Sequence, residues 1–289
     1  MKIAIASGKG GTGKTTVAVN LFHFLSKATN QSVQLIDCDV EEPNDLLFFN
    51  NAANTSSKEV FTQIPKIEIS KCTFCKKCSE WCEFNAITIV KNLQFAEVNN
   101  DSCHSCGACS VACEFSAIIE HPQPLGMISE YTNKMGNRIV EGRLEIGSAL
   151  QTVLIKEVKK SAEKPDTISI FDAPPGTSCP VVETISDADY IILVTEPTPF
   201  GLYDLKLTVE LIRGLKIPFG VIVNKAGLGN DQIYYYLEEN KIELIGNIPF
   251  SKEYAAKYSK GEILQNISEE VTLYYKQAVE KLKSIMEVA

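Results

Sequence analysis

Eight of the ten cysteines fall into two copies of one spacing. The copies are Cys72-x2-Cys75-x2-Cys78-x3-Cys82 and Cys103-x2-Cys106-x2-Cys109-x3-Cys113. Thiolates are soft ligands that suit both iron–sulfur clusters and zinc. In a reducing compartment, clustered cysteines are metal ligands or redox groups more often than disulfides. Two complete runs of four cysteines favour two iron–sulfur clusters over two zinc sites.

This segment resembles the bacterial ferredoxins, in which the fourth cysteine of each run ligates the other cluster. The resemblance assigns one 4Fe–4S cluster to Cys72, Cys75, Cys78 and Cys113. It assigns the second 4Fe–4S cluster to Cys82, Cys103, Cys106 and Cys109. Glu83 and Glu114 stand where those proteins usually have proline, which leaves every ligand in place. His104 lies inside the second run and is expected to be a bystander, because cysteines fill each ligand position.

A second chemical signature lies near the N-terminus, where Gly8 to Thr15 match the pattern G-x-x-x-x-G-K-[ST]. An apolar strand pattern precedes it and a helical pattern follows, so its N–H groups can surround phosphate oxygens at a helix N-terminus. We expect Lys14 to reach the β- and γ-phosphates and the Thr15 hydroxyl to help hold Mg²⁺. The residues expected to contact the nucleotide here are Gly10, Gly11, Thr12, Gly13, Lys14, Thr15 and Thr16.

A second lysine, Lys9, lies within this loop. The run from Lys9 to Thr16 resembles the deviant Walker A motif of the MinD/Mrp superfamily, which includes MinD, ParA and the nitrogenase iron protein. The resemblance implies ATP and ADP as ligands and a homodimer that forms with ATP. It also implies that Lys9 is catalytic and reaches the partner subunit's phosphates. A solvated lysine in a mobile loop is the alternative.

Three further positions resemble parts of the same ATPase machinery. Asp39 follows a strand, as in switch I of the family, which implies that it activates the attacking water and contacts the Mg²⁺ shell. Asp172 begins a segment like Walker B and switch II, so it would hold Mg²⁺ through water while the Gly176 N–H senses the γ-phosphate. Asn224 matches the family's adenine-recognition asparagine, and Pro249 lies where a segment often contacts the base. Aspartates at strand ends also serve as simple caps.

Strand and helix patterns alternate around these residues. Apolar strands are expected at 2–6, 33–36, 167–171, 190–194 and 219–223, and helices at 15–27, 149–162, 202–215, 231–240 and 271–286. Such alternation predicts a doubly wound, mainly parallel sheet of the α/β P-loop NTPase class. Residues 50–58, rich in Asn, Ser, Thr and Ala, predict a linker.

The predicted ATPase domain is discontinuous, covering 1–60 and 121–289. A small α+β ferredoxin-like domain with an internal repeat is expected at 61–120 between its two parts.

The bulk composition excludes several classes of partner. The 289 residues carry a net charge of −8, which argues against nucleic acid. No apolar run reaches the roughly 20 residues needed to span a bilayer, so stable membrane insertion is not expected. The first residues resemble a strand rather than a signal peptide, which predicts a cytoplasmic protein.

Two cysteines lie outside the repeat. Cys38 is expected to be a small buried residue. Cys179 has the same offset from Asp172 as a cluster-ligating cysteine of the nitrogenase iron protein has from its own aspartate. A structural or redox-sensing thiol is favoured there, because no second cysteine offers to complete a shared cluster.

Taken with the resemblance, the sequence predicts an Mg²⁺-dependent ATPase whose ATP-driven dimerisation gates electron transfer from two 4Fe–4S clusters to a partner protein. One alternative is an ATPase for metallocluster assembly, with a metallocluster protein as partner. Another is a MinD-like spatial regulator, which would need a basic amphipathic tail. The C-terminal residues are only mildly amphipathic.

Overall fold

The structure is a computed structural model that describes residues 1–288. The chain forms two compact units. The first unit contains Met1–Ser57, Ile128–Arg143 and the chain from Ile155 onward. The second unit contains Lys58–Met127 and Leu144–Leu154.

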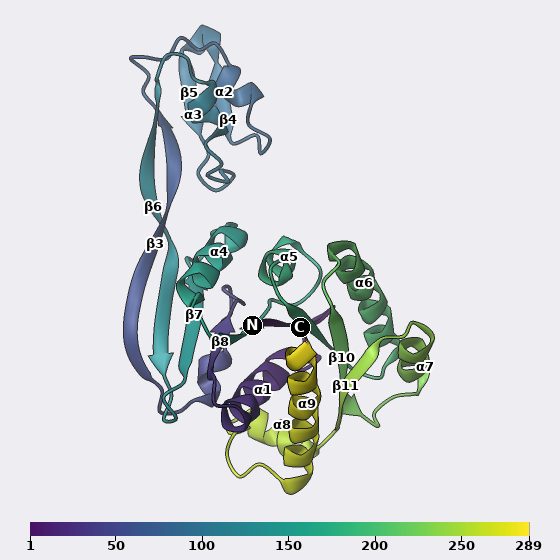
Figure 1. Cartoon of the computed structure of the whole chain (residues 1–289). Helices are drawn as coiled ribbons and strands as arrows, with labels where there is room; N and C mark the ends of the chain where they lie inside the picture. The colour runs from purple at the N-terminus through teal and green to yellow at the C-terminus, as the bar shows by residue number, and fades with distance from the viewer. Residues whose placement is uncertain (289) are drawn as a thin grey trace. The chain divides into compact units, whose positions relative to one another are not determined.

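A largely parallel sheet forms the centre of the first unit (Figure 1). Its strands are β1 (Lys2–Ala6), β2 (Ser32–Asp37), β7 (Arg138–Leu144), β8 (Thr167–Asp172), β9 (Tyr190–Thr195), β10 (Phe219–Ala226) and β11 (Glu243–Pro249). They are ordered β11-β10-β9-β1-β8-β2-β7, and β6 and β3 follow after β7. All the pairings from β11 to β7 are parallel, which confirms the predicted α/β sheet.

Helices cover both faces of this sheet, as parallel sheets require (Figure 1). On one face lie α1 (Lys14–Ala28), α8 (Lys252–Tyr258) and α9 (Glu269–Val288), and on the other lie α5 (Cys179–Ile185) and α6 (Pro199–Leu215). The remaining helices of the first unit are α7 (Gln232–Glu239), the short 3₁₀ helix η1 (Asp45–Phe48) and the greater part of α4 (Gln151–Ala162). Within residues 1–288, no helix combines the length and apolar character needed to cross a membrane.

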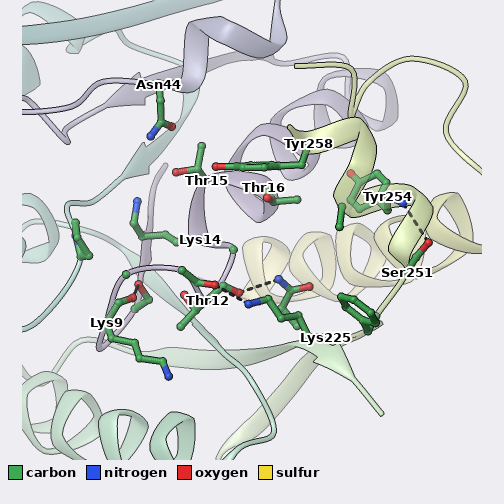
Figure 2. Close-up of a pocket in the computed structure, with 18 of the residues that line it drawn as sticks. Lys9, Thr12, Lys14, Thr15, Thr16, Asn44, Lys225, Ser251, Tyr254 and Tyr258 are labelled. Atoms are coloured by element: carbon green, nitrogen blue, oxygen red, sulfur yellow. Dashed lines mark hydrogen bonds between the residues drawn. The ribbon is translucent and has the colours of Figure 1, made fainter. Parts of the chain in front are cut away.

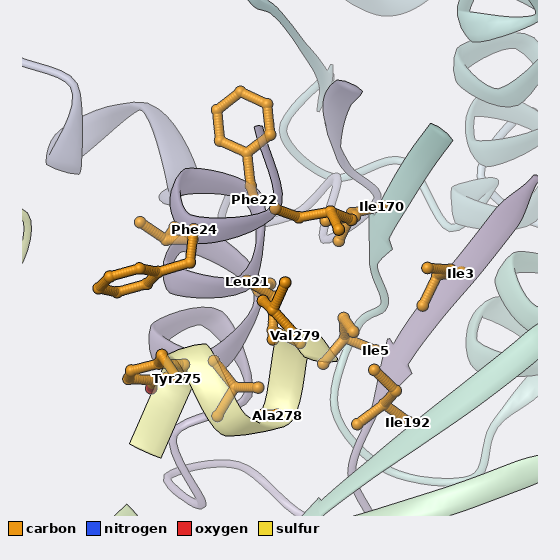
Figure 3. Packing of buried hydrophobic residues seen from close by; sticks show 14 of the residues in the cluster. Ile3, Ile5, Leu21, Phe22, Phe24, Ile170, Ile192, Tyr275, Ala278 and Val279 are labelled. Atoms are coloured by element: carbon orange, nitrogen blue, oxygen red, sulfur yellow. The ribbon is translucent and has the colours of Figure 1, made fainter. Parts of the chain in front are cut away.

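The core of the first unit lies between the central strands and helices α1 and α9 (Figure 3). Ile3 and Ile5 of β1 are fully buried, as is Leu21 of α1. Phe24 stacks on Tyr275 of α9 with ring centroids 5.7 Å apart. Burying each large apolar side chain contributes about 1.5–3 kcal/mol, so this core fixes β1 and α1, which flank the phosphate loop.

The linker predicted at residues 50–58 is wrong, because strand β3 (Ala53–Ile67) begins there. Most side chains in its first half are exposed. The strand lies beside β6 (Ile118–Thr132), and the Thr55 hydroxyl donates to the Glu130 carbonyl at 3.2 Å. A strand held by pairing rather than burial has no need of apolar residues, so composition alone misled the prediction.

The second unit is built around a two-stranded antiparallel sheet and two short helices. Its elements include β4 (Ile87–Val90), η2 (Lys91–Leu93), β5 (Phe95–Val98), α2 (Lys77–Glu80) and α3 (Ala108–Ala112). The small core contains Phe74, Ile87 and Ile89 together with the thiols of Cys78 and Cys109. Cysteines are thus part of the packing, and the apolar core beside them is small.

Candidate functional site

The phosphate loop of the first unit runs from the end of β1 to the start of α1. Gly11 and Gly13 adopt left-handed backbone conformations, with φ of 78° and 90°. A cavity of about 370 Å³ lies against the loop (Figure 2). The loop residues expected to contact nucleotide all line it: Gly10, Gly11, Thr12, Gly13, Lys14, Thr15 and Thr16.

Lys14 and Thr15, the first residues of α1, both contact Asp172. The Lys14 ammonium donates to Asp172 Oδ1 at 2.7 Å, and the Thr15 hydroxyl donates to Asp172 Oδ2 at 2.8 Å. Burial alone would lower the pKa of Lys14, but the Asp172 carboxylate raises it above its ordinary value. The lysine therefore remains charged inside the protein.

Two aspartates that the sequence did not single out lie beside Asp172. Carboxylate oxygens of Asp37, Asp45 and Asp172 all lie within 4.8 Å of one another, and all three residues are buried. Asp37 accepts backbone N–H bonds from Asp39, Asn44 and Asp45 at 3.0, 2.8 and 3.0 Å. Burial and the nearby Asp172 raise the pKa of Asp37 to about 7. This carboxylate shapes the loop after β2.

Asp45 differs from its two neighbours because neither of its carboxylate oxygens has a hydrogen-bond partner within the described chain. Burial and Asp37 raise the pKa of Asp45 well above its ordinary value. Asp37 could have been found from the sequence, because it ends an apolar strand, and strand ends meet at one edge of a parallel sheet. In the structure, β2 pairs in parallel with β8 and places Asp37 opposite Asp172. Asp45 begins the short 3₁₀ helix η1, and no periodicity or spacing in the sequence marks it.

Asp39, the acid expected to act on water, lines the cavity but lies outside the three-carboxylate group. Burial raises its pKa, Lys14 opposes the rise, and Asp172 adds to it. Gly176 has a φ of 96°, and its N–H donates to the Ser7 carbonyl at 3.0 Å. The Gly176 N–H is therefore engaged by the protein in this conformation, and Pro175 rather than Gly176 lines the cavity.

The far end of the cavity is formed by residues from the end of β10 to α8. Asn224 Nδ2 donates to the Thr12 carbonyl at 2.8 Å, which ties β10 to the phosphate loop. A Cβ on Gly13 would collide with that amide. Pro249 lines the cavity as expected, while the aromatic walls provided by Tyr254 and Tyr258 were not predicted.

Polar atoms along the cavity wall lack partners. The Thr12 hydroxyl and Asn44 Oδ1 are buried, and neither has a hydrogen-bond partner among residues 1–288. Both residues line the cavity. Because a buried polar atom without a partner is costly, these groups fit a polar ligand in the cavity.

Lys9 is held by a network that the sequence did not predict. Its ammonium lies 2.9 Å from Glu196 Oε1, and Lys225 Nζ lies 3.0 Å from Glu196 Oε2. Lys225 also donates to the Gly11 carbonyl at 2.7 Å. These contacts bring together three charged residues far apart in the sequence.

The second unit brings its thiols into two groups. Burial raises the pKa of Cys78 to about 11, and the nearby thiols of Cys113, Cys72 and Cys75 add to the rise. For Cys103, burial is again the main cause, and Cys106 and Cys82 contribute. Burial is also the main cause of the raised pKa of Cys109, and the thiols of Cys103 and Cys106 add to it.

The two thiol groups are built by repeated backbone geometry. Left-handed residues recur 31 positions apart, as in the pairs Phe74 and Ser105, Lys76 and Gly107, and Asn85 and Ser116. The Cys82 thiol accepts the Ala86 N–H at 3.3 Å, and the Cys113 thiol accepts the Ala117 N–H at 3.4 Å. The internal repeat is therefore structural as well as sequential.

The cysteines outside the repeat lie in the first unit. Cys38 is buried, as expected, and burial raises its pKa well above the ordinary value. Cys179 is exposed at the first position of α5.

Comparison with known proteins identifies the family of the chain. Residues 3–264 match the family CbiA, the CobQ/CobB/MinD/ParA nucleotide binding domain. An uncharacterized protein of Methanocaldococcus jannaschii is 33% identical over 265 residues, which cover 91% of this chain and 90% of the relative. An iron–sulfur cluster carrier protein of Aquifex aeolicus is 24% identical over 304 residues, covering 99% of this chain and 68% of the carrier.

Solved structures with the same fold include two archaeal MinD proteins. The cell division ATPase MinD of Pyrococcus furiosus matches with a TM-score of 0.59 and 16% identity over 98% of each chain. MinD of Pyrococcus horikoshii, complexed with Mg-ADP, matches with a TM-score of 0.59 and 18% identity over 99% of this chain and 97% of that one. The chain thus belongs to the CobQ/CobB/MinD/ParA family of P-loop nucleotide-binding proteins.

Proposed function

We propose that this protein is an Mg²⁺-dependent ATPase that carries two 4Fe–4S clusters and couples ATP-driven dimerisation to electron transfer toward a partner protein. The observation that carries the proposal is the presence in one chain of a phosphate-loop cavity and two groups of four thiols. The proposed division is an ATPase domain at 1–60 and 121–289 with a ferredoxin-like domain at 61–120.

In the proposed ATP site, the glycine-rich loop surrounds the phosphates with its N–H groups. Lys14 is charged and buried, so it can neutralise phosphate oxygens in a region of low dielectric. Thr15 and Asp172 offer the hard oxygen ligands that Mg²⁺ prefers. Asp39 lines the cavity, and in this proposal it orients the water that attacks the γ-phosphate.

Hydrolysis in this proposal needs a second subunit. Lys9 supplies its charge to the partner subunit's phosphates, where it stabilises the charge that develops as the terminal phosphoryl group leaves. Binding of ATP therefore favours the dimer, and loss of the phosphate weakens it. Asn224 contacts the base. Gly176 senses the γ-phosphate only after its N–H leaves the Ser7 carbonyl.

The thiol groups of the second unit fit iron–sulfur cubes better than zinc. A tetrahedral zinc site holds its four sulfurs about 3.8 Å apart, given Zn–S bonds of about 2.3 Å. In residues 1–288, the one group of three or more ligand atoms all within 4.8 Å is the aspartate group of the first unit. In a cube each thiolate binds a different iron, so the sulfurs stand farther apart. Bound clusters would supply one-electron redox chemistry.

Cluster assembly is the second candidate function. The similarity to an iron–sulfur cluster carrier protein over 99% of this chain favours it. Against transfer of a cluster as cargo, four cysteines are available for each proposed cube, which leaves no open position. A role in supplying electrons during assembly is compatible with both candidates.

The test is to purify the protein anaerobically, reduce it, and record its EPR spectrum and cluster potentials with and without MgATP. Electron transfer gated by ATP predicts a shift in potential or signal that is absent in Lys14→Ala. Two clusters indifferent to MgATP would contradict the coupling. Transfer of cluster iron to an apo-acceptor, with loss from this protein, would favour the assembly role.

A further inference from the structure

Glu196 lies at the junction of three chain segments. It directly follows β9, and its side chain is only 15% exposed. One carboxylate oxygen is paired with Lys9 of the phosphate loop, and the other is paired with Lys225 at the end of β10. A single carboxylate therefore holds two lysines that both border the nucleotide cavity.

The pairing fixes where the Lys9 ammonium lies in one subunit. Lys9 is 32% exposed, and its ammonium lies 5.9 Å from the centre of the Phe200 ring of α6. Both contacts are within its own chain, whereas the proposed catalytic role requires the same ammonium at the partner subunit's phosphates. Lys9 cannot pair closely with Glu196 and with those phosphates at once.

We propose that Glu196 is a positioning residue, a latch that holds Lys9 against its own subunit until MgATP in the partner subunit draws the lysine away. The inference rests on the proposed function, because it assumes that Lys9 acts in trans. After release, Glu196 keeps Lys225 as its partner, so the carboxylate is not left buried without a counter-charge. That second lysine makes the release feasible, since breaking a buried pair is costly when one charge is left alone.

The size of the effect follows from exposure. Water partly screens the Lys9–Glu196 pair, so one latch should weaken dimerisation about threefold. Both subunits carry a latch, and the two factors multiply. Removing the carboxylate charge with Glu196→Gln should therefore tighten the MgAMPPNP-dependent dimer about tenfold.

A different role would give a different pattern. If Glu196 only shapes the phosphate loop through Lys225 and Gly11, Glu196→Gln and Lys225→Gln should both weaken nucleotide binding and neither should tighten the dimer. Under the latch, Lys225→Gln keeps the Lys9–Glu196 pair, so it should not tighten the dimer. Glu130→Gln is the matched control, because Glu130 is a half-buried carboxylate paired with Arg138 and lies in strand β6, outside the cavity lining.

The experiment has two readouts on the full-length holoprotein. Sedimentation of wild type, Glu196→Gln, Lys225→Gln and Glu130→Gln with MgAMPPNP gives the dimer dissociation constants. Brief acetylation of the ADP-bound monomers, followed by mass spectrometry, gives the reactivity of Lys9. The latch predicts that Glu196→Gln alone tightens the dimer, and that Lys9 reacts about threefold faster in that variant than in wild type.

The outcomes separate the latch from the proposed function. A wild-type protein that stays monomeric with MgAMPPNP would remove the trans role of Lys9, and the latch with it. A wild-type dimer with an unchanged or weaker Glu196→Gln dimer would overturn the latch alone. Unchanged Lys9 acetylation in Glu196→Gln would overturn the latch in the monomer, independently of any dimer.

Discussion

The two units position their chemical groups by opposite means. In the first unit, the Asn224 amide donates to the Thr12 carbonyl although the two residues are 212 positions apart in the sequence. The Lys14 ammonium donates to Asp172, which is 158 positions away. In the second unit, the Cys82 thiol accepts an N–H from a residue only four positions away, and the Cys113 thiol does the same. One site depends on the whole sheet, whereas the other depends on short turns within each cysteine run and on one cysteine from the other run.

This difference decides what a mutation should do. A site made by local turns loses only the group that is removed, because its neighbours keep their own backbone geometry. A site made by long-range contacts couples distant residues, so a change at one point moves another. The experiments that follow test that contrast.

The largest effect is expected in the local thiol groups. Cys113→Ala should remove the proposed cluster of Cys72, Cys75, Cys78 and Cys113 and leave the other, so that iron content falls by about half. Cys82→Ala should remove the other cluster instead. Iron, sulfide and EPR analysis of anaerobic protein would check this, with Cys179→Ala as a control that keeps both. Loss of all iron in either variant would contradict local independence.

In the long-range site, Gly13→Ala should disrupt ATP binding at a distance. The new Cβ is strained at a φ of 90° and would displace the Asn224 amide from Thr12. The strain and the lost hydrogen bond together cost about 2–3 kcal/mol, or roughly a 30- to 150-fold weaker affinity for ATP. Isothermal titration would measure it.

Gly10→Ala is the comparison variant for that titration. A Cβ on Gly10 meets no atom within 4 Å, so its effect should be clearly smaller. Equal losses in the two variants would show that loop flexibility, rather than the contact with Asn224, determines binding.

A gain in stability is expected from Asp45→Asn in protein free of nucleotide and Mg²⁺. Folding raises the pKa of Asp45, so the folded state binds more protons and wild-type stability falls as pH rises above about 4. An amide removes the charge and can donate to Asp37 or Asp172. The free energy of unfolding of the variant should exceed that of wild type by about 1–2 kcal/mol at pH 8 and by less near pH 4. Urea unfolding at both values would test this, and a gain independent of pH would contradict the cause.

The smallest effect is expected in the pH dependence of stability that arises from His23 and its neighbour Lys27 in the first unit. Burial, with help from Lys27, lowers the pKa of His23 to about 4. The unfolded chain then binds more protons between pH 4 and about 6.5, so this contribution is present above pH 6.5 and is lost as pH falls. His23→Gln should flatten that part of the stability profile by about 1 kcal/mol after solvent screening. An unchanged slope would show that His23 is not its source.

The same contrast explains what could be read from the sequence. Spacing located both cysteine runs, and the resemblance to ferredoxins divided them into two groups of four. The glycine-rich run located the phosphate loop, because local geometry dictates such patterns. Asp172 and Asn224 lie near the ends of apolar strands, and their roles were predicted from the resemblance to the family's motifs. Parallel strands bring such ends to one edge of a sheet. Asp45 and Glu196 were missed, because each gains its importance only from partners that the fold brings near.

The linker predicted from composition at residues 50–58 was wrong, because β3 begins there. Its polar residues suit a strand whose partner is β6, and that partner lies more than 60 residues farther along the chain. Composition reports on burial, and this strand is stabilised by pairing. The aromatic walls of Tyr254 and Tyr258 escaped notice for a related reason, since their helix is short and carries no recognisable pattern.

The bond from Asn224 to Thr12 bears on how the proposed ATP site would contact adenine. One N–H of the Asn224 amide is engaged by the loop, so its other N–H and its Oδ1 remain to meet a ligand. Adenine offers an amino donor at its sixth ring position, whereas guanine offers a carbonyl acceptor there. The contact that shapes the phosphate loop thereby also orients the amide that would meet the base in the proposed ATP site.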